Sequence, residues 1–167
     1  YNGFQKEALK TRLKIPLIYG IDAVHGHNNV FGATMFPHNI GLGCANDKLL
    51  VQKIAAATAV EVKATGLDWT FAPCVAVAQD ERWGRTYESF SEDSDIVTEL
   101  GVASTIGYQG RTLNKNSLLA CAKHFVGDGN TLFGTGTNWY KIDRGDVILE
   151  EEELRSKYIK PFKESIK

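Results

Sequence analysis

The sequence lacks any apolar run of the roughly 18 residues that cross a bilayer, and so it predicts no membrane-spanning helix. An excess of charge of one sign is also missing, because 19 Lys and Arg residues nearly balance 20 Asp and Glu residues, for a net charge of −1. This balance gives no electrostatic reason to expect a nucleic acid or an acidic membrane as a partner. The first 16 residues lack the apolar segment and the small-residue cleavage site of a signal peptide.

Cysteine is scarce and arranged without a pattern. The three residues, Cys44, Cys74 and Cys121, are odd in number and form no close-spaced metal motif. Cys74 and Cys121 fall within strand-like runs, which favours small buried hydrophobic side chains. The cysteines do not indicate a redox compartment.

What the sequence does contain is an alternation of apolar runs and helical patterns, with the 43% hydrophobic and 23% charged content of an ordinary globular domain. Strands are expected within residues 15–26, 67–78 and 118–126, the first of them buried on both faces. Residues 36–43 are expected to form a loop or short strand.

Helices are expected between and after these strands. The patterns predict one helix over the first residues, one that begins at Asn46 or Asp47 and closes at Gly66, one from Ser91 to near Gly110, and one from about Leu149 with a kink at Pro161.

Strand, loop and helix follow one another three times, which predicts an α/β fold with a parallel sheet. A complete (β/α)8 barrel of the TIM type takes about 250 residues. The 167 residues are therefore expected to be three consecutive βα units, roughly the first half of such a barrel. Both ends fall within helical patterns, as in a chain cut from a longer one.

Polar side chains gather after each predicted strand, where parallel α/β folds place their binding groups. They combine charges of both signs with an aromatic ring. This mixture suits a sugar, whose hydroxyl groups bind carboxylates and cations and whose C–H face packs on aromatic rings. The candidates are Asp22, His25 and His27, then Arg82, Trp83 and Arg85, then Lys123, His124 and Asp128.

The residues by themselves also allow two other kinds of site, one for a metal ion and one for a phosphate. His25 and His27 form an HxH pair that could bind a metal, as in metal-dependent amidohydrolase barrels, but no clear third ligand accompanies them. Both could equally be structural histidines that hold the loop. The glycine-rich stretch from Gly127 to Gly136 could cradle a phosphate, yet it matches neither a Walker A loop nor GxGxxG.

Three segments together resemble glycoside hydrolase family 3, the family of β-glucosidases and exo-β-glucanases. They are YGIDAVHGHNNVFGATMFPHNIGLG (residues 19–43), ERWGRTYESFSED (residues 81–93) and ACAKHFVGDGNT (residues 120–131). Their order and spacing match the family, and the resemblance covers nearly the whole chain. The KHFVGDG form is typical of the glucosidase branch, because the N-acetylhexosaminidase branch carries a His where Asp128 stands.

The resemblance implies a β-glucoside or β-glucan substrate, no cofactor and no metal. It implies that Asp22, Arg85, Lys123 and His124 bind the non-reducing-end sugar, and that they act by orienting it and by complementing the transition state. His25, His27 and Asp128 are expected to support loops. Glu88 and Glu92 are expected to be structural, paired with a nearby Arg or capping the helix.

The two catalytic groups are not expected in this chain. A retaining glycosidase needs two carboxyl groups about 5–5.5 Å apart, and in this family the nucleophile is an Asp in an SDW-like motif on a later strand. The acid/base is a Glu often supplied by a second α/β domain. The only Asp-Trp here, Asp68-Trp69, follows a Leu and comes too early.

The resemblance therefore implies a parent enzyme that releases β-D-glucose with retention, in which this chain holds part of the glucose pocket and has the rest of the enzyme as its partner. A β-xylosidase, a broad exo-β-glucanase and a non-catalytic sugar-binding module are the alternatives. Export is common in the family, so a secreted, periplasmic or lysosomal location is a family expectation only.

Overall fold

Three extended segments lie side by side in the order of the chain, and all three run parallel. In this computed structural model, which describes residues 1–137 and 139–167, β1 (Gly20–Ile21) pairs with β2 (Trp69–Thr70) so that Gly20 lies opposite Trp69. The third segment joins β2 through parallel bridges from Trp69 to Leu119 and from Cys74 to Lys123. The parallel sheet predicted from the sequence is confirmed.

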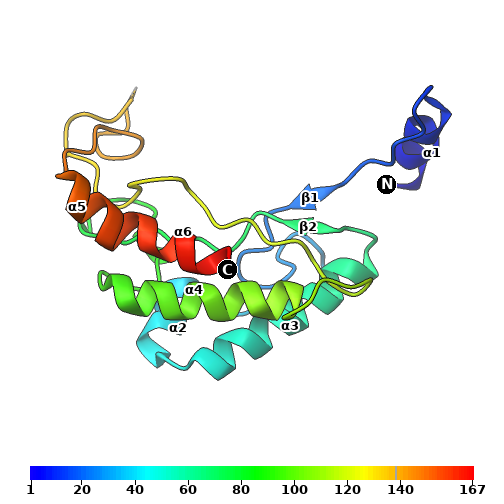
Figure 1. Cartoon of the computed structure of the whole chain (residues 1–167), viewed down its shortest axis with the longest axis horizontal. Helices are drawn as coiled ribbons and strands as arrows, with labels where there is room; N and C mark the ends of the chain where they lie inside the picture. Colours follow the sequence, from blue (N-terminus) through cyan, green and yellow to red (C-terminus); the bar gives the residue numbers. More distant parts are fainter. Residues whose placement is uncertain (138) are drawn as a thin grey trace.

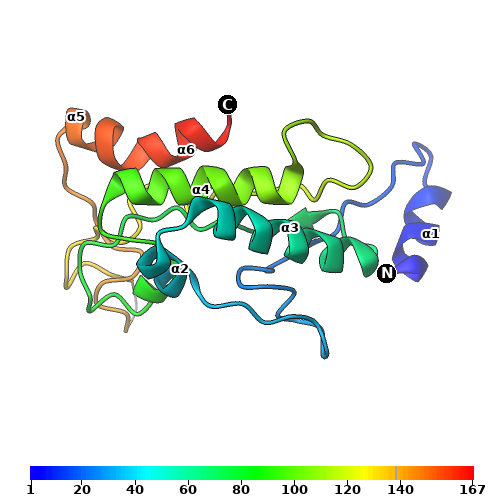
Figure 2. The same cartoon turned by 90° about the horizontal axis from the view of Figure 1, so that it is seen from below.

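Two long helices make the crossovers between these segments. Helix α3 (Lys48–Ala64) leads from β1 to β2, and α4 (Ser94–Gln109) leads from β2 to the third segment. Helix α4 packs between α3 and α6, as the two views in Figures 1 and 2 show. The remaining helical elements are α1 (Asn2–Lys10), α2 (Asn39–Ala45), η1 (Thr86–Glu88), α5 (Glu151–Glu153), the π-helical η2 (Leu154–Ile159) and α6 (Lys160–Ser165).

Helix α3 begins and ends where its sequence predicts. The Asp47 side chain accepts hydrogen bonds from the backbone amides of Leu49 and Leu50, at 2.9 and 3.0 Å, and so caps the first turn. After the C-cap Thr65, Gly66 adopts a φ of +85°, a left-handed conformation that favours glycine. Helix α4 is capped by Asp93, which accepts from Asp95, rather than by Ser91 or Glu92.

The core lies between the sheet and the layer of helices. Helix α4 contributes Val97 and Leu100, both fully buried, and they pack with Val75 and Val77 from the segment after β2. Tyr158 and Phe162, from the last helical stretch, close the same cluster. These apolar contacts fix α4 and α6 against the carboxyl ends of the strands.

Two local predictions are wrong. The run before β1 is not buried on both faces, since Ile15 is 62% and Ile18 is 54% exposed. It lies at the edge of the sheet, and no strand in the described parts of the chain covers its outer side. Residues 39–45 form helix α2 instead of a loop or short strand, despite the glycines at 41 and 43. Gly43 lets this helix pack closely, since a Cβ there would lie 1.6 Å from the Phe90 carbonyl oxygen.

The predicted last helix is present but changes its hydrogen-bond pattern. It starts at Glu151, passes through the π-helical residues 154–159 and returns to α-helix at Lys160. Pro161 follows directly and has no amide hydrogen to donate to the preceding turn. Across residues 1–137 and 139–167, none of the helices has the length and apolar character needed to cross a membrane.

Candidate active site

A cavity of about 830 Å³ opens at the carboxyl ends of the three extended segments. Asp22, Arg85, Lys123 and His124 all line it, so the four residues predicted to bind one sugar do lie around one space. Asp22 directly follows β1, Arg85 lies in the loop after β2, and Lys123 and His124 end the third segment. The parallel topology brings these groups to one edge of the sheet, although Asp22 and Lys123 are 101 residues apart in the chain.

Asp22 and Lys123 form an ion pair on one side of the cavity. Lys123 Nζ donates to Asp22 Oδ1 at 2.6 Å. The Lys123 side chain is only 14% exposed, whereas that of Asp22 is 59% exposed. In the described part of the chain no hydrogen bond reaches Asp22 Oδ2, which leaves this oxygen able to accept from a ligand hydroxyl.

A chain of hydrogen bonds forms the other side. Arg85 Nη2 donates to His124 Nε2 at 2.8 Å, and His124 Nδ1 lies 2.8 Å from Asp128 Oδ2. Arg85 also donates to both oxygens of Glu88, at 2.7 and 2.9 Å. The hydrogen bond to Glu88 raises the pKa of Arg85 above its usual value, so the guanidinium is always charged.

Two of the supporting roles predicted from the sequence match this geometry. Glu88 pairs with an arginine, and Asp128 holds the ring of His124. The Glu92 side chain does not cap α4, because Asp93 does; the carbonyl of Glu92 accepts from Gln79 at 2.9 Å.

His25 and His27 do not line the cavity. His25 Nδ1 contacts the Phe36 carbonyl oxygen at 3.1 Å, and its ring stacks on His38 with centroids 3.9 Å apart. His27 is 1% exposed, and its Nε2 lies 3.0 Å from Thr65 Oγ1. Within residues 1–137 and 139–167 no three His, Cys, Asp or Glu side chains are grouped to hold a metal ion.

Trp83 was expected to offer aromatic surface to a sugar, and this is wrong. It is 2% exposed, and its indole Nε1 donates to Asp143 Oδ1 at 2.9 Å. Arg82 lines the cavity but is paired with Asp80, whose pKa that contact lowers to about 2. The exposed aromatic rings of the cavity come from Phe133, Trp139 and Tyr140 instead.

Those three aromatic residues were missed because the segment after Thr131 matches no part of the family pattern with confidence. The sequence did contain a local signal for an aromatic surface, because these three aromatic residues fall in one glycine-rich stretch. Of the stretch from Gly134 to Trp139, Asn138 lies outside the described residues.

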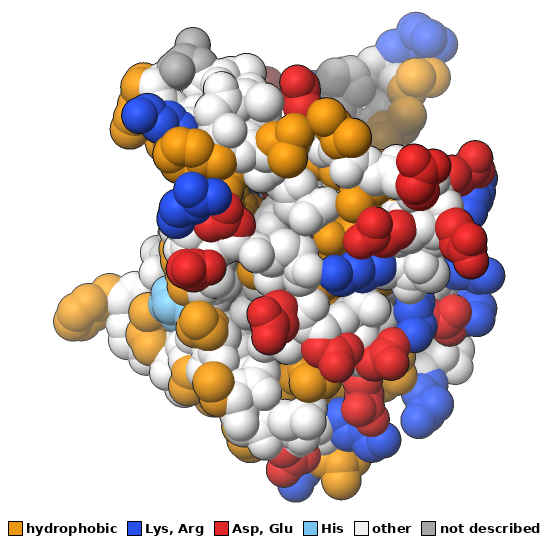
Figure 3. All heavy atoms as spheres, turned by 90° about the vertical axis from the view of Figure 1, so that its left-hand side faces the viewer, with side chains coloured by type: hydrophobic (Ala, Val, Ile, Leu, Met, Phe, Trp, Pro, Cys, Tyr) orange, Lys and Arg blue, Asp and Glu red, His pale blue; other side chains and the backbone are white. Residues whose placement is uncertain are grey.

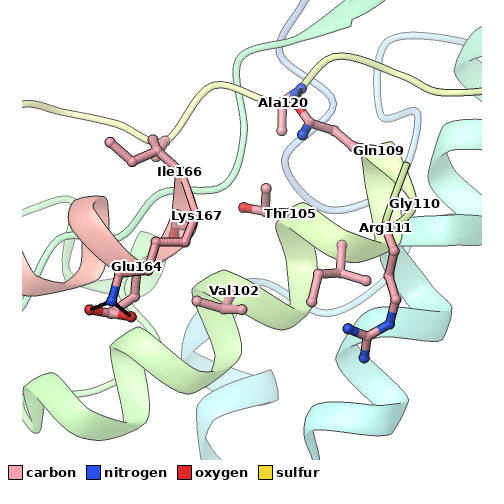
Figure 4. A pocket seen from close by; sticks show the side chains of 12 residues that line it. Val102, Thr105, Gln109, Gly110, Arg111, Ala120, Glu164, Ile166 and Lys167 are labelled. Carbon is pink, nitrogen blue, oxygen red and sulfur yellow. Dashed lines mark hydrogen bonds and ion pairs between the residues drawn. The ribbon is translucent and has the colours of Figure 1, made fainter. Parts of the chain in front are cut away.

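A second cavity, of about 680 Å³, lies between the end of α4 and the end of the chain (Figure 4). Gln109 and Arg111 approach it from one side, and the ion pair of Glu164 and Lys167, 2.7 Å apart, from the other. None of the residues predicted to bind a sugar lies here.

The whole chain, residues 1–167, matches the model of the glycosyl hydrolase family 3 N-terminal domain. The chain belongs to glycosyl hydrolase family 3. A lysosomal beta glucosidase of Dictyostelium discoideum is 35% identical over 159 residues, which are 92% of this chain and 18% of that protein. A periplasmic beta-glucosidase of Salmonella typhimurium is 32% identical, over 92% of this chain and 19% of that protein.

Solved structures of the family superpose closely on this chain. An exo-1,3/1,4-beta-glucanase from Pseudoalteromonas gives a TM-score of 0.88 at 46% identity, over 97% of this chain and 20% of that one. A mutant beta-glucosidase from Listeria innocua in complex with laminaribiose gives 0.87 at 35% identity, over 99% of this chain and 22% of that one. The fold is therefore part of a TIM-type (β/α)8 barrel, as predicted, and the chain spans about a fifth of the length of these family 3 relatives.

Proposed function

We propose that the chain forms part of the glucose pocket of a retaining β-glucosidase, which releases β-D-glucose from the non-reducing end of β-glucosides. The observation that carries the proposal is the Asp22–Lys123 pair, held at 2.6 Å on the wall of a cavity that also contains Arg85 and His124. The type of reaction is inferred from the family 3 membership of the chain and from the β-glucosidases among its relatives.

The four side chains suit a sugar rich in hydroxyl groups. The free oxygen of Asp22 accepts from one hydroxyl, while Lys123 and Arg85 donate to sugar oxygens. Hydrogen bonds to charged groups are worth about 1.5–3 kcal/mol each, and they accelerate the reaction to the extent that they strengthen as the ring distorts. Specificity for glucose then comes from several such bonds made at once.

The bond-breaking carboxyl groups belong to other parts of the enzyme. Of the carboxylates that line the cavity, Asp22 pairs with Lys123 through one oxygen and is assigned to the sugar through the other, Asp128 holds His124, and Asp143 accepts from Trp83. Asp68, which precedes Trp69, does not line the cavity and pairs with Lys63 at 2.5 Å. We therefore assign residues 1–167 to a partial N-terminal barrel domain, whose partners are the rest of the barrel and a second α/β domain.

A broad exo-β-glucanase is the second candidate, because the Pseudoalteromonas enzyme with 46% identity carries that name. A panel of β-1,3- and β-1,4-linked glucans separates the two candidates. A β-glucosidase acts on short glucosides in preference to polymers, and an exo-glucanase does the opposite.

The Asp22→Ala variant of the full-length enzyme tests the pocket. We expect kcat for an aryl β-glucoside to fall about 10- to 100-fold, since a charged hydrogen bond realised in the transition state is lost. Asp68→Ala is the matched control, because it also removes the carboxylate of a lysine ion pair, but away from the cavity. Unchanged kinetics for Asp22→Ala would refute the assignment.

A further inference from the structure

The loop between the third segment and α5 presents aromatic rings to the cavity. We call residues 131–146, of which Asn138 is not described, the aromatic loop. Trp139 and Tyr140 stack with centroids 3.9 Å apart and ring planes 25° apart. Trp139 is 78% exposed and lines the same cavity as Asp22 and Lys123. Within the described residues the indole packs on Tyr140 and leaves most of its surface open beside a polar pocket.

Hydrogen bonds hold the aromatic loop in place. The Leu132 amide donates to the Asp146 carbonyl, and the Asp146 amide donates to Thr135 Oγ1, both at 2.8 Å. Buried Trp83 donates to Asp143, which ties the loop to the segment that carries Arg85. The Arg82 guanidinium lies 4.3 Å from the centre of the Phe133 ring. The rings are therefore positioned both by the hydrogen-bonded scaffold of the loop and by their contacts with each other and with Arg82.

Trp139 lies further out of the cavity than Lys123. The Lys123 side chain is 14% exposed, whereas Trp139 is 78% exposed, so the indole lies at the mouth. The volume of about 830 Å³ is within the range of pockets for ligands larger than a monosaccharide. Figure 3 shows that acidic and basic side chains both occur over the end of the molecule that carries this loop.

The chemistry at the mouth fits a second sugar. Trp139 offers a flat apolar surface for the C–H face of a pyranose ring. Lys141 and Arg144 line the cavity beside it and can donate to hydroxyl groups. A purely apolar leaving group would have no use for these cations.

We propose that Trp139, stacked on Tyr140, binds the sugar on the leaving-group side of the scissile bond and so selects substrates with a second glucosyl unit. This inference rests on the proposed β-glucosidase function. Trp139 is a specificity-determining residue here, because it contacts the part of the substrate that departs.

The test compares the activity of the full-length enzyme on two kinds of substrate. β-D-Glucosyl fluoride has no second sugar, whereas β-1,3- and β-1,4-linked glucose disaccharides have one. For Trp139→Ala we expect kcat/KM on the disaccharides to fall roughly tenfold and kcat/KM on glucosyl fluoride to change less than about twofold. Trp139→Phe, which keeps an aromatic face, is expected to recover most of the loss.

Phe31→Ala is the matched control, because Phe31 is an exposed aromatic residue that does not line the cavity. This variant should leave kcat/KM unchanged both on glucosyl fluoride and on the disaccharides. An equal fall on both substrates, or no fall on the disaccharides, would overturn the role of Trp139. A wild-type enzyme inactive on glucosyl fluoride and on the disaccharides alike would instead refute the β-glucosidase function itself.

Discussion

His124 has a hydrogen-bond partner at each ring nitrogen, and the two partners define its tautomer. Arg85 can only donate, so Nε2 accepts and carries no proton. Nδ1 then carries the proton and donates to Asp128. The imidazole is thus held from both sides, and Asp128 orients the ring that faces Arg85.

Cys74 gives a second test at the scale of single residues. It is 2% exposed, and burial raises the pKa of its thiol to about 11. Because the thiolate is the reactive form, we expect Cys74 of the folded protein to resist iodoacetamide at pH 8, while exposed Cys44 reacts. Mass spectrometry of the modified peptides measures both rates.

Unfolding the protein in urea before alkylation provides the control, since both cysteines should then react alike. Modification of Cys74 in the folded protein as fast as Cys44 would contradict its burial.

At the scale of the elements, the closeness of α3 and α4 depends on Gly107. A Cβ at this position would lie 2.4 Å from the Gln52 carbonyl oxygen and 2.5 Å from Ala55 Cβ, both on α3. Contacts this short force backbone or side chains to move. The glycine therefore has a packing role in a helix interior, where it is otherwise unfavourable by about 1 kcal/mol relative to alanine.

Gly107→Ala is expected to lower the free energy of unfolding by about 1–2 kcal/mol, because the clash outweighs the gain in helix propensity. Urea denaturation measures the change. Gly3→Ala in α1 is the matched control, since no atom lies within 4 Å of its added Cβ, and it should cause no loss. A stabilising effect of Gly107→Ala would show that the two helices are not held this closely.

Helix α1 differs from the other helices in its surroundings. It has no buried residue and lies apart from the main body, at the end of the molecule opposite α5 (Figure 1). Its links to the segment before β1 are local: Gln5 Oε1 accepts from the Leu17 amide at 2.8 Å, and the rings of Tyr1 and Tyr19 pack edge to face. Amphipathic spacing predicted this helix correctly but not its exposure.

For the molecule as a whole, we expect the isolated 167-residue chain to show no turnover of an aryl β-glucoside. Its cavity offers groups that we propose hold a sugar, but none of the three carboxylates that line it is followed by a Trp, as the family nucleophile is, and retaining hydrolysis needs both a nucleophile and an acid/base. Hydrolysis is followed by release of the chromophore, with the full-length enzyme as the positive control. Measurable turnover by the isolated chain would refute the argument from the carboxylates.

Apart from helix α2, the order of strands and main helices was predictable from the sequence, as were the N-cap at Asn46 or Asp47, the closure at Gly66 and the strand-end positions of Asp22, Arg85, Lys123 and His124. Caps and periodicity depend on residues a few positions apart, and the strand-end rule follows from parallel topology. The extent of each strand was not predictable, because a strand needs a neighbour, and the run before β1 lies uncovered at the edge.

Only the tertiary structure decided which aromatic rings face the cavity. Trp83 is buried in an apolar cluster that includes Ile142, and its indole donates to Asp143, 60 residues later, in the loop that carries Trp139. No local pattern encodes a pairing at that separation. The sequence alone determined which groups reach the carboxyl edge of the sheet, and long-range packing determined which of them remain exposed there to meet a ligand.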